Sequence, residues 1–193
     1  MGKVLLIGGS PMTGKSTAAR KIASMYEISA VSTDDIGEIL KTAADIDPMK
    51  GMNYLDYYEN TDIDTLIKDL ETYHLAIRNA VTRMIEIHSG WGASMIIEGY
   101  AIYPDIKLTA NTSAVWFTAP EELLRSRLEK SAAFARASEK AKEHYLQRSL
   151  RHDRLIRKMC GEYGRRCITV SGNESAEELA GMILAETGSS FKT

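Results

Sequence analysis

The chain has 193 residues, of which 44% are hydrophobic and 26% charged, a composition typical of one globular domain with a sizeable core. Its formal net charge of -2 gives no overall attraction to nucleic acid, and no apolar run approaches the ~20 residues that span a bilayer. No signal-peptide pattern precedes the first strand, and the two cysteines, Cys160 and Cys167, form no metal-binding motif. We therefore expect a cytoplasmic protein with plain thiols.

Charge is distributed unevenly along the chain. Residues Asp34 to Glu71 include 11 acidic and 3 basic side chains, which gives a local net charge of -8. Residues Pro120 to Arg166 include 13 basic and 7 acidic side chains, which gives a local net charge of +6. Blocks of opposite sign predict different roles for the two segments.

The N-terminal part begins with a strand, a turn and a helix. The apolar run at 3–8 ends in glycine and is typical of a buried parallel strand. After a glycine-rich turn, residues 15–25 are helix formers with small and apolar side chains on one face, which predicts a helix. A short second strand is expected at 30–32, and Ser32 or Thr33 can cap a helix that begins near Asp34.

The rest of the chain continues this alternation. The stretch from about 45 to 58 contains proline, glycine and tyrosines without clear periodicity, so we expect a loop or a broken helix there. The later part of the chain is predicted to contain a long amphipathic helix over 66–88 and strands at 94–97, 114–117 and 167–170. Three further helices are expected: one that begins at 120, one over 138–160, and a last one that ends near 186. Alternating strands and helices predict an α/β domain with a mainly parallel sheet, and we expect residues 1–193 to form a single domain.

The glycine-rich turn has the sequence Gly9-Ser10-Pro11-Met12-Thr13-Gly14-Lys15-Ser16 and is followed by Thr17. It matches the phosphate-binding pattern Gly-x4-Gly-Lys-Ser, and it lies between a strand and a helix, as that mechanism requires. The glycines let successive amide groups point at phosphate oxygens, and the helix N-terminus adds a favourable dipole. Lys15 should reach the β- and γ-phosphates, and the Ser16 hydroxyl should bind Mg2+.

The loop alone does not distinguish kinases from GTPases, ATPase motors or regulatory switches. The chain has no Asn-Lys-x-Asp element for reading guanine, no ABC-type signature and no long ATPase extension. A chain of this length has little room for anything beyond one nucleotide-binding site. These features favour a compact phosphotransferase.

Three carboxylates follow predicted strands at the edge of the sheet that carries the phosphate loop. Asp34 and Asp35 come after the second strand, where a kinase needs a base to accept the proton of the acceptor hydroxyl. Two adjacent aspartates cannot both face one point, and the alternative is that both only stabilise the helix N-terminus. Glu98 closes the third strand and is a candidate to hold Mg2+ or to orient the attacking hydroxyl, unless it is simply an exposed strand end. Gly99 beside it allows close approach of a ligand or of neighbouring backbone.

The basic segment offers arginines for a mobile lid that closes over the phosphates. Arg127 and Arg136 are the first candidates because they flank the expected start of the lid, and Arg151 and Arg154 are the second. For any one of these arginines, the competing interpretation is a solvated helix face or an ion pair.

Three blocks of sequence, at 8–17, 31–40 and 96–104, resemble the kinase domain of 2-phosphoglycerate kinase-like proteins. More broadly, the chain is similar to the nucleoside-monophosphate-kinase-like group, which includes gluconate, shikimate, adenylylsulfate and antibiotic-modifying kinases. The resemblance implies a three-layer P-loop NTPase fold with a five-stranded parallel sheet of order 2-3-1-4-5. It also implies a helical lid over about 125–160, acceptor-side helices over about 34–90, and MgATP as the phosphoryl donor.

The resemblance also assigns residues. It implies that Asp34 is the acceptor-side base, that Arg127 packs on adenine, and that the loop containing Gly172 borders adenine. The chain departs from the phosphoglycerate-type pattern at Gly37, where that pattern has an arginine, and at Ala101, where it has a histidine. Both departures weaken the case for a phosphorylated acceptor.

We therefore expect transfer of the γ-phosphoryl group of ATP to a hydroxyl of a small-molecule acceptor by a monomer or homodimer. If the acidic segment lines the acceptor side, a neutral or cationic acceptor is favoured; if those acids face solvent, it is not. A nucleic-acid end kinase is one alternative, but nucleic acid is an unlikely partner because the basic segment has few aromatic residues for stacking. The other alternative is a nucleotide-binding regulatory ATPase.

Overall fold

A five-stranded parallel β-sheet forms the centre of the protein in the computed structural model, which describes residues 2–44, 46–188 and 191. The strands are β1 (Val4–Gly9), β2 (Ser29–Ser32), β3 (Met95–Glu98), β4 (Thr112–Thr118) and β5 (Cys167–Thr169). Their order is β2-β3-β1-β4-β5, and every pair of neighbours is parallel. The predicted sheet order is confirmed.

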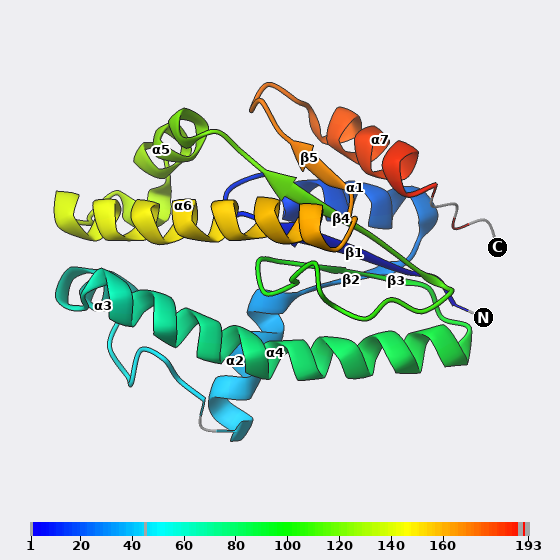
Figure 1. Ribbon diagram of the computed structural model, residues 1–193, viewed down its shortest axis with the longest axis horizontal. Coiled ribbons are helices and arrows are strands. Elements are labelled where there is room, and N and C mark those ends of the chain that lie inside the picture. The colour runs from blue at the N-terminus through cyan, green and yellow to red at the C-terminus, as the bar shows by residue number, and fades with distance from the viewer. Residues whose placement is uncertain (1, 45, 189–190, 192–193) are drawn as a thin grey trace.

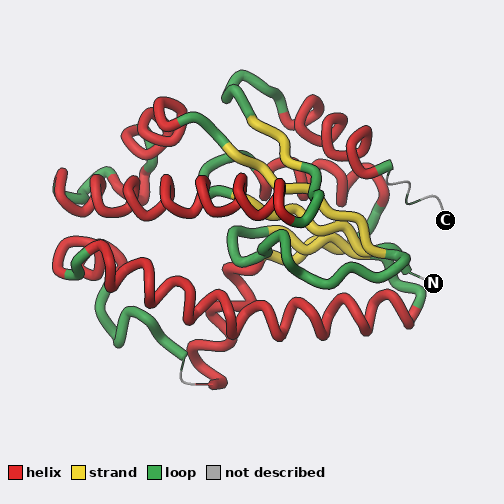
Figure 2. The backbone as a smooth tube through the Cα atoms, in the orientation of Figure 1, coloured by secondary structure: helices red, strands yellow, loops and turns green. Residues whose placement is uncertain are grey.

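Helices cover both faces of the sheet (Figures 1 and 2). Helices α1 (Lys15–Tyr26) and α7 (Ala176–Thr187) pack on one face, and α4 (Ile63–Trp91) and α6 (Glu139–Glu162) pack on the other. Strand β1 is buried along its whole length, because its side chains enter two separate apolar clusters. Leu5 and Ile7 belong to one cluster, and Val4 and Leu6 belong to the other. Each such side chain contributes about 1.5–3 kcal/mol of hydrophobic stabilisation. The predicted three-layer architecture is therefore present.

The shorter helices are α2 (Thr33–Ala44), α3 (Tyr54–Asn60), α5 (Glu121–Glu129) and a 3-10 turn at Ala132–Phe134. Helix α3 occupies the end of the segment predicted as a loop or broken helix, so the loop alternative is wrong for these residues. The Asn53 side chain accepts a hydrogen bond of 3.0 Å from the Asp56 amide at the start of the helix, and Tyr57 and Tyr58 are buried. Two turns are too short to show a periodic pattern, so packing against α6 decides their conformation. Asp45 lies outside the described residues.

Helix α4 is longer than the predicted helix over 66–88. Asp62 caps its start by accepting hydrogen bonds from the amides of Asp64 and Thr65, at 3.1 and 3.0 Å. At its other end the helix continues through Gly90 and stops at Gly92, whose φ of 83° is left-handed. Among the helices of the described chain, none combines the length and the apolar character that crossing a bilayer requires.

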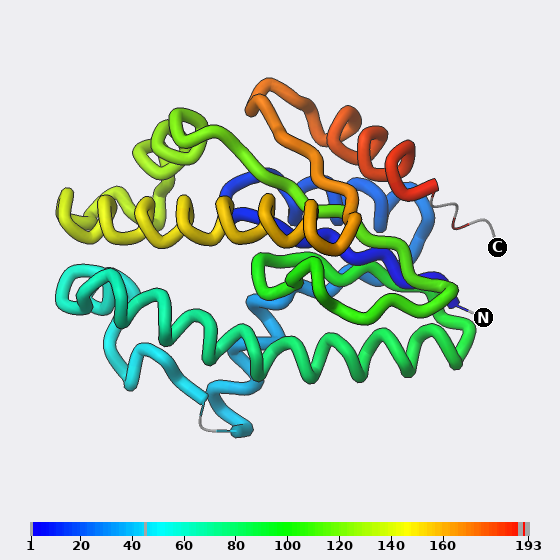
Figure 3. The backbone as a smooth tube through the Cα atoms, viewed as in Figure 1, coloured from blue at the N-terminus to red at the C-terminus, as the bar shows by residue number. Residues whose placement is uncertain are grey.

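Several helices extend beyond the carboxyl ends of the strands. Helices α3 and α5 and the first halves of α4 and α6 all lie past this edge of the sheet (Figure 1). In Figure 3 the cyan segment around α3 runs beside the yellow first half of α6, and the two helices are in extensive contact although about eighty residues separate them. Of these overhanging helices, α3, α4 and α6 line a cavity together with the glycine-rich turn.

Candidate active site

The turn between β1 and α1 has the backbone geometry of a phosphate cradle. Gly9 has a φ of 114°, and a Cβ there would lie 2.0 Å from the carbonyl oxygen of Phe117, so only glycine fits. Gly14 has a φ of 92° and immediately precedes α1. The Thr13 hydroxyl donates to the Ser10 carbonyl at 2.8 Å and holds the turn closed. The first amides of α1 have no partners within the helix, so they are available to an anion.

Lys15 lies buried in this cradle. Its ammonium group donates to the Ser10 carbonyl and lies 3.5 Å from Thr13 Oγ1. Burial lowers the pKa of Lys15 to about 8, against the opposing influence of the Glu98 and Asp34 carboxylates. A cation held in this way at the start of a helix is a suitable partner for phosphate oxygens. Ser16 lines the adjoining cavity, while the side chain of Thr17 is exposed and does not line it.

Asp34 and Glu98 face Lys15 across the same cavity. Glu98 ends β3 and is buried, and β3 places it level with Ile7 of β1 and Ser32 of β2. Burial by the surrounding protein raises the pKa of Asp34, and the nearby Glu98 raises it further. Both aspartates are accessible to solvent, but only Asp34 lines the cavity, and this distinguishes it from Asp35. Gly99 is required here, because a Cβ would lie 1.8 Å from Thr33 Oγ1.

The structure brings one of the two first-choice arginines to the phosphate loop. Arg127 donates from Nη1 to the Met12 carbonyl and from Nη2 to the Gly172 carbonyl, the latter at 3.5 Å, so it joins the loop to the turn after β5. Arg136 is exposed between the 3-10 turn and α6 and does not line the cavity. Of the second-choice arginines, Arg151 pairs with Asp64 at 3.0 Å and Arg154 is exposed. Lid roles for these three arginines gain no geometric support.

A buried carboxylate on α6, which the sequence analysis missed, holds the phosphate loop from the opposite side. Asp153 accepts hydrogen bonds from the Ser10 hydroxyl at 2.6 Å and from the Ala119 amide at 3.0 Å. Its second oxygen accepts from Arg157 Nε at 2.6 Å. Nothing in the local sequence distinguishes Asp153 from the other acids of a charged helix, because Ser10 and Ala119 lie 143 and 34 residues away from it.

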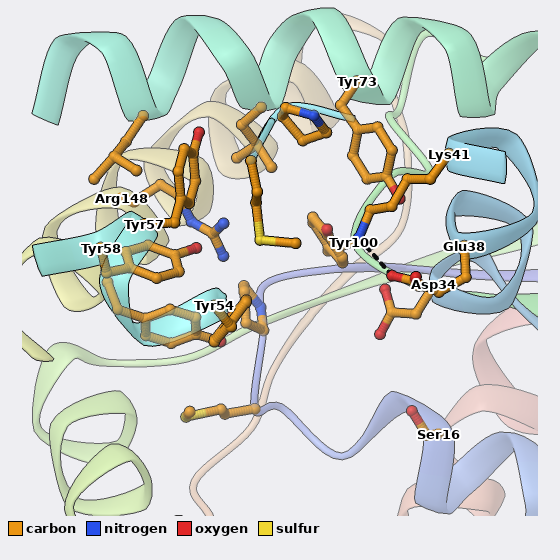
Figure 4. A pocket seen from close by; sticks show the side chains of 18 of the residues that line it. Ser16, Asp34, Glu38, Lys41, Tyr54, Tyr57, Tyr58, Tyr73, Tyr100 and Arg148 are labelled. Carbon is orange, nitrogen blue, oxygen red and sulfur yellow. Dashed lines mark hydrogen bonds and ion pairs between the residues drawn. The ribbon is translucent and has the colours of Figure 1, made fainter. Parts of the chain in front are cut away.

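The cavity has a volume of about 590 Å³ and extends from the phosphate loop to the overhanging helices. Its far part is lined by aromatic side chains from α3, α4, α6 and the turn after β3 (Figure 4). These residues are Tyr54, Tyr57, Tyr58, Tyr73, Tyr100 and Tyr145. The guanidinium group of Arg148 lies among them. The tyrosines at 54–58 were visible in the sequence, but their common orientation depends on helix α3.

The cavity suits a nucleotide and a metal ion in its chemistry. A Mg2+ ion keeps several waters and needs only one or two protein ligands, which the Ser16 hydroxyl and the Glu98 carboxylate can supply directly or through water. Within residues 2–44, 46–188 and 191 there is no cluster of three or more histidine, cysteine or carboxylate side chains that could form a protein-only metal cage.

Comparisons with known proteins agree with this geometry at the level of the fold. A sugar kinase from Janibacter sp. HTCC2649 superposes with a TM-score of 0.61 and 17% identity, over 96% of this chain and 94% of the other. A gluconokinase from Sinorhizobium meliloti 1021 gives 0.57 and 16%, over 97% and 91%. A shikimate kinase from Acinetobacter baumannii in complex with shikimate gives 0.53 and 16%, over 96% and 90%. The chain shares the three-layer fold of these kinases.

Sequence comparison adds less. No protein-family model matches the chain, so the resemblance to 2-phosphoglycerate kinase-like proteins stays a prediction. Uncharacterised proteins of Mycobacterium tuberculosis (strain ATCC 25618 / H37Rv) and Mycobacterium bovis are each 29% identical over 112 residues, which is 58% of this chain. The match covers only 20% of the length of either relative. The P-loop kinase fold is thus shared with proteins of known activity, while the similar mycobacterial sequences carry no assigned one.

Proposed function

We propose that the protein is an ATP-dependent kinase that transfers the γ-phosphoryl group to a hydroxyl of a small-molecule acceptor. The observation that carries the proposal is the common cavity: Lys15 and Ser16 of the phosphate loop line the same space as Asp34 and Glu98. That space continues past the loop and offers room for a second small molecule. The sugar, gluconate and shikimate kinases that share the fold support the same class of reaction.

Each residue of the site has a role in this transfer. The acceptor oxygen forms a bond to the γ-phosphorus while the bond from that phosphorus to the β,γ-bridging oxygen breaks, and ADP leaves. Asp34 accepts the proton of the acceptor hydroxyl, and its raised pKa makes it a stronger base than an ordinary aspartate. Lys15 and the amides of the loop stabilise the charge on the transferring group.

Binding on the donor side uses the residues around the loop. MgATP supplies the transferable phosphoryl group when it is bound. Ser16 and Glu98 are the residues that would hold its metal ion. Arg127 contacts the loop at Met12 and the turn after β5 at Gly172, and neither Arg127 nor Gly172 lines the cavity; an adenine ring would pack there on the guanidinium plane.

The proposal is tested by ATP consumption in the presence of a panel of small hydroxylated molecules. At least one acceptor should raise ADP release well above the background hydrolysis of the wild-type protein. Asp34→Asn should reduce the acceptor-dependent rate by about 10²–10⁴-fold, because general base catalysis contributes that much. Asp35→Asn is the matched control, since Asp35 lies one residue away and does not line the cavity. A protein that binds MgATP but shows no acceptor-dependent turnover, or equal loss in both variants, would contradict the proposal.

A further inference from the structure

The end of the cavity farthest from the phosphate loop has an unusual electrostatic character. Arg148 of α6 is only 8% exposed, and its guanidinium carbon lies 4.9 Å from the ring centroid of Tyr145 and 5.1 Å from that of Tyr58. The ring of Tyr100 is 5.9 Å away. In Figure 4 the guanidinium group points into the cavity among these rings. Arg148 is thus held in place by aromatic faces.

Arg148 has no anionic partner among the described residues. No carboxylate of the described chain forms an ion pair with it, and its Nε is buried without a hydrogen-bond partner. Burying an unpaired charge is costly, and rings compensate only part of the lost hydration. An unsatisfied cation directed into a cavity therefore indicates a site for an anionic group of a ligand.

The other charges of the cavity are already matched. Lys41 pairs with Glu38 at 2.6 Å, and Lys15 belongs to the phosphate cradle with Asp34 and Glu98 beside it. Of the acids in the segment from 34 to 71, only Asp34 and Glu38 are among the described residues that line the cavity. The local net charge of -8 therefore does not make the acceptor site acidic, and the expectation of a neutral or cationic acceptor loses its basis.

The shape of the wall bears on the size and charge of the anion. Position 37 of α2 is glycine and adds no further cation to the acceptor end, and a Cβ there would lie 2.0 Å from the Tyr73 hydroxyl oxygen. One guanidinium group balances the single charge of a carboxylate, whereas a phosphomonoester dianion would keep about one unbalanced charge. The aromatic walls suit a flat or apolar body between the two polar ends.

We propose, building on the kinase function above, that the acceptor is a small hydroxylated carboxylic acid whose carboxylate binds Arg148 while its hydroxyl faces Asp34. The surrounding phenols assist this binding. Burial raises the pKa of Tyr58 and Tyr145 above the ordinary tyrosine value, so both stay protonated near neutral pH and can donate hydrogen bonds to the carboxylate. The acceptor would then be held between a cation at one end and a base at the other.

The first test uses the wild-type protein and matched pairs of acceptors. Gluconate, shikimate, quinate and hydroxymethylbenzoate are each compared with their own amides, and phosphoglycerate and kanamycin represent phosphorylated and cationic acceptors. Phosphorylation is followed by ADP release and by mass spectrometry of the product. At least one acid should be phosphorylated with a kcat/KM about 10- to 100-fold above that of its amide, because the amide cannot accept a charge-assisted bidentate pair.

The second test uses Arg148 variants with the best acid. Arg148→Met should raise the KM for the acid about 10- to 100-fold and the KM for its amide by much less, because the amide loses only a neutral hydrogen bond. Arg148→Lys keeps the charge but not the fork, so it should restore part of the affinity. Arg151→Met is the matched control, because Arg151 lies on the same helix, is exposed and pairs with Asp64. Circular dichroism and Tm show whether each variant is folded.

Several outcomes overturn the inference, and they differ from failure of the kinase function. Preferred phosphorylation of phosphoglycerate, kanamycin or the amides leaves the kinase function standing and removes the carboxylate. Equal loss of kcat with acids and amides in Arg148→Met assigns Arg148 to phosphoryl transfer instead. If Arg148→Met does not fold, the wild-type comparison of acids and amides still decides. If no acceptor raises ADP release, the proposed function itself fails.

Discussion

Asp34 and Lys15 occupy the same cavity, and burial shifts their pKa values toward each other. The pKa of Asp34 rises, chiefly through burial and then through Glu98, and that of Lys15 falls to about 8. As a base, Asp34 must be ionised, whereas Lys15 must be protonated to hold phosphate. The active form therefore exists only between the two pKa values.

This predicts a bell-shaped dependence of kcat/KM on pH. Activity should fall on the acidic side as Asp34 takes up a proton, at a pH above the ordinary aspartate range, and on the basic side near pH 8 as Lys15 loses its proton. Lys15→Arg should lower the rate but move the basic limb above pH ~10, because arginine stays charged. A basic limb at the same pH in both proteins would assign it to another group.

Gly37 is a second position where one residue decides the shape of the site. A Cβ there would lie 2.0 Å from the Tyr73 hydroxyl oxygen and 2.8 Å from the ring carbon that bears it. Gly37→Ala should therefore lower the free energy of unfolding by about 1–3 kcal/mol, the usual cost of overpacking. Gly37→Arg, which introduces the residue of the phosphoglycerate-type pattern, should lower the free energy of unfolding further.

The control for Gly37 is Gly181, which lies inside α7. A Cβ at position 181 would have no atom of the described chain within 4 Å, apart from its two chain neighbours and the nearby backbone of its own helix. Gly181→Ala should raise stability by about 0.5–1 kcal/mol through helix propensity alone. Urea unfolding of the two variants measures both effects, and a stabilising Gly37→Ala would show that Tyr73 has room to move.

At the scale of elements, helix α6 connects the two halves of the site. Its Arg148 reaches the acceptor end of the cavity, and its Asp153 binds the Ser10 hydroxyl and the Ala119 amide. A rigid helix thus fixes the distance between the phosphate loop and the proposed carboxylate site.

Asp153→Asn should disturb both stability and nucleotide binding. It removes a buried charge that Arg157 pairs with at 2.6 Å, and we expect a loss of about 1–3 kcal/mol together with weaker MgATP binding as Ser10 loosens. Asp64→Asn, which breaks the exposed pair with Arg151, should change stability by less than about 1 kcal/mol. Calorimetric unfolding and MgATP titration check both; equal effects would mean that Asp153 does not position the loop.

At the scale of the whole molecule, the two tryptophans report on different regions. Trp116 of β4 is fully buried and donates to the Ile102 carbonyl at 2.8 Å, whereas Trp91 at the end of α4 is 77% exposed. If residues 1–193 form a single domain, Trp91→Phe should leave stability within about 0.5 kcal/mol of the wild type. The remaining Trp116 emission should then shift to the red in the same urea transition that removes the far-ultraviolet circular dichroism. Separate transitions would show that the overhanging helices unfold independently.

Most of the sheet could be predicted because its signals are local. Strands β1 and β3 and the end of β4 are short apolar runs, and the phosphate loop is a continuous motif with fixed spacing. The sequence left α3 undecided between a loop and a broken helix, because two helical turns show no detectable period. Its conformation depends on contact with α6 far along the chain.

The sequence by itself determined the phosphate loop, most strands and helices in their chain order, Asp34 after β2 and Glu98 at the end of β3. Only the tertiary structure decided which charges share the cavity. It separated Asp34 from Asp35, placed most of the acidic segment away from the cavity wall, and brought Arg148, Asp153 and the tyrosines to the site. The physical reason is that electrostatic and packing energies depend on distance and burial in space, and residues more than a hundred positions apart acquire both only when the chain folds.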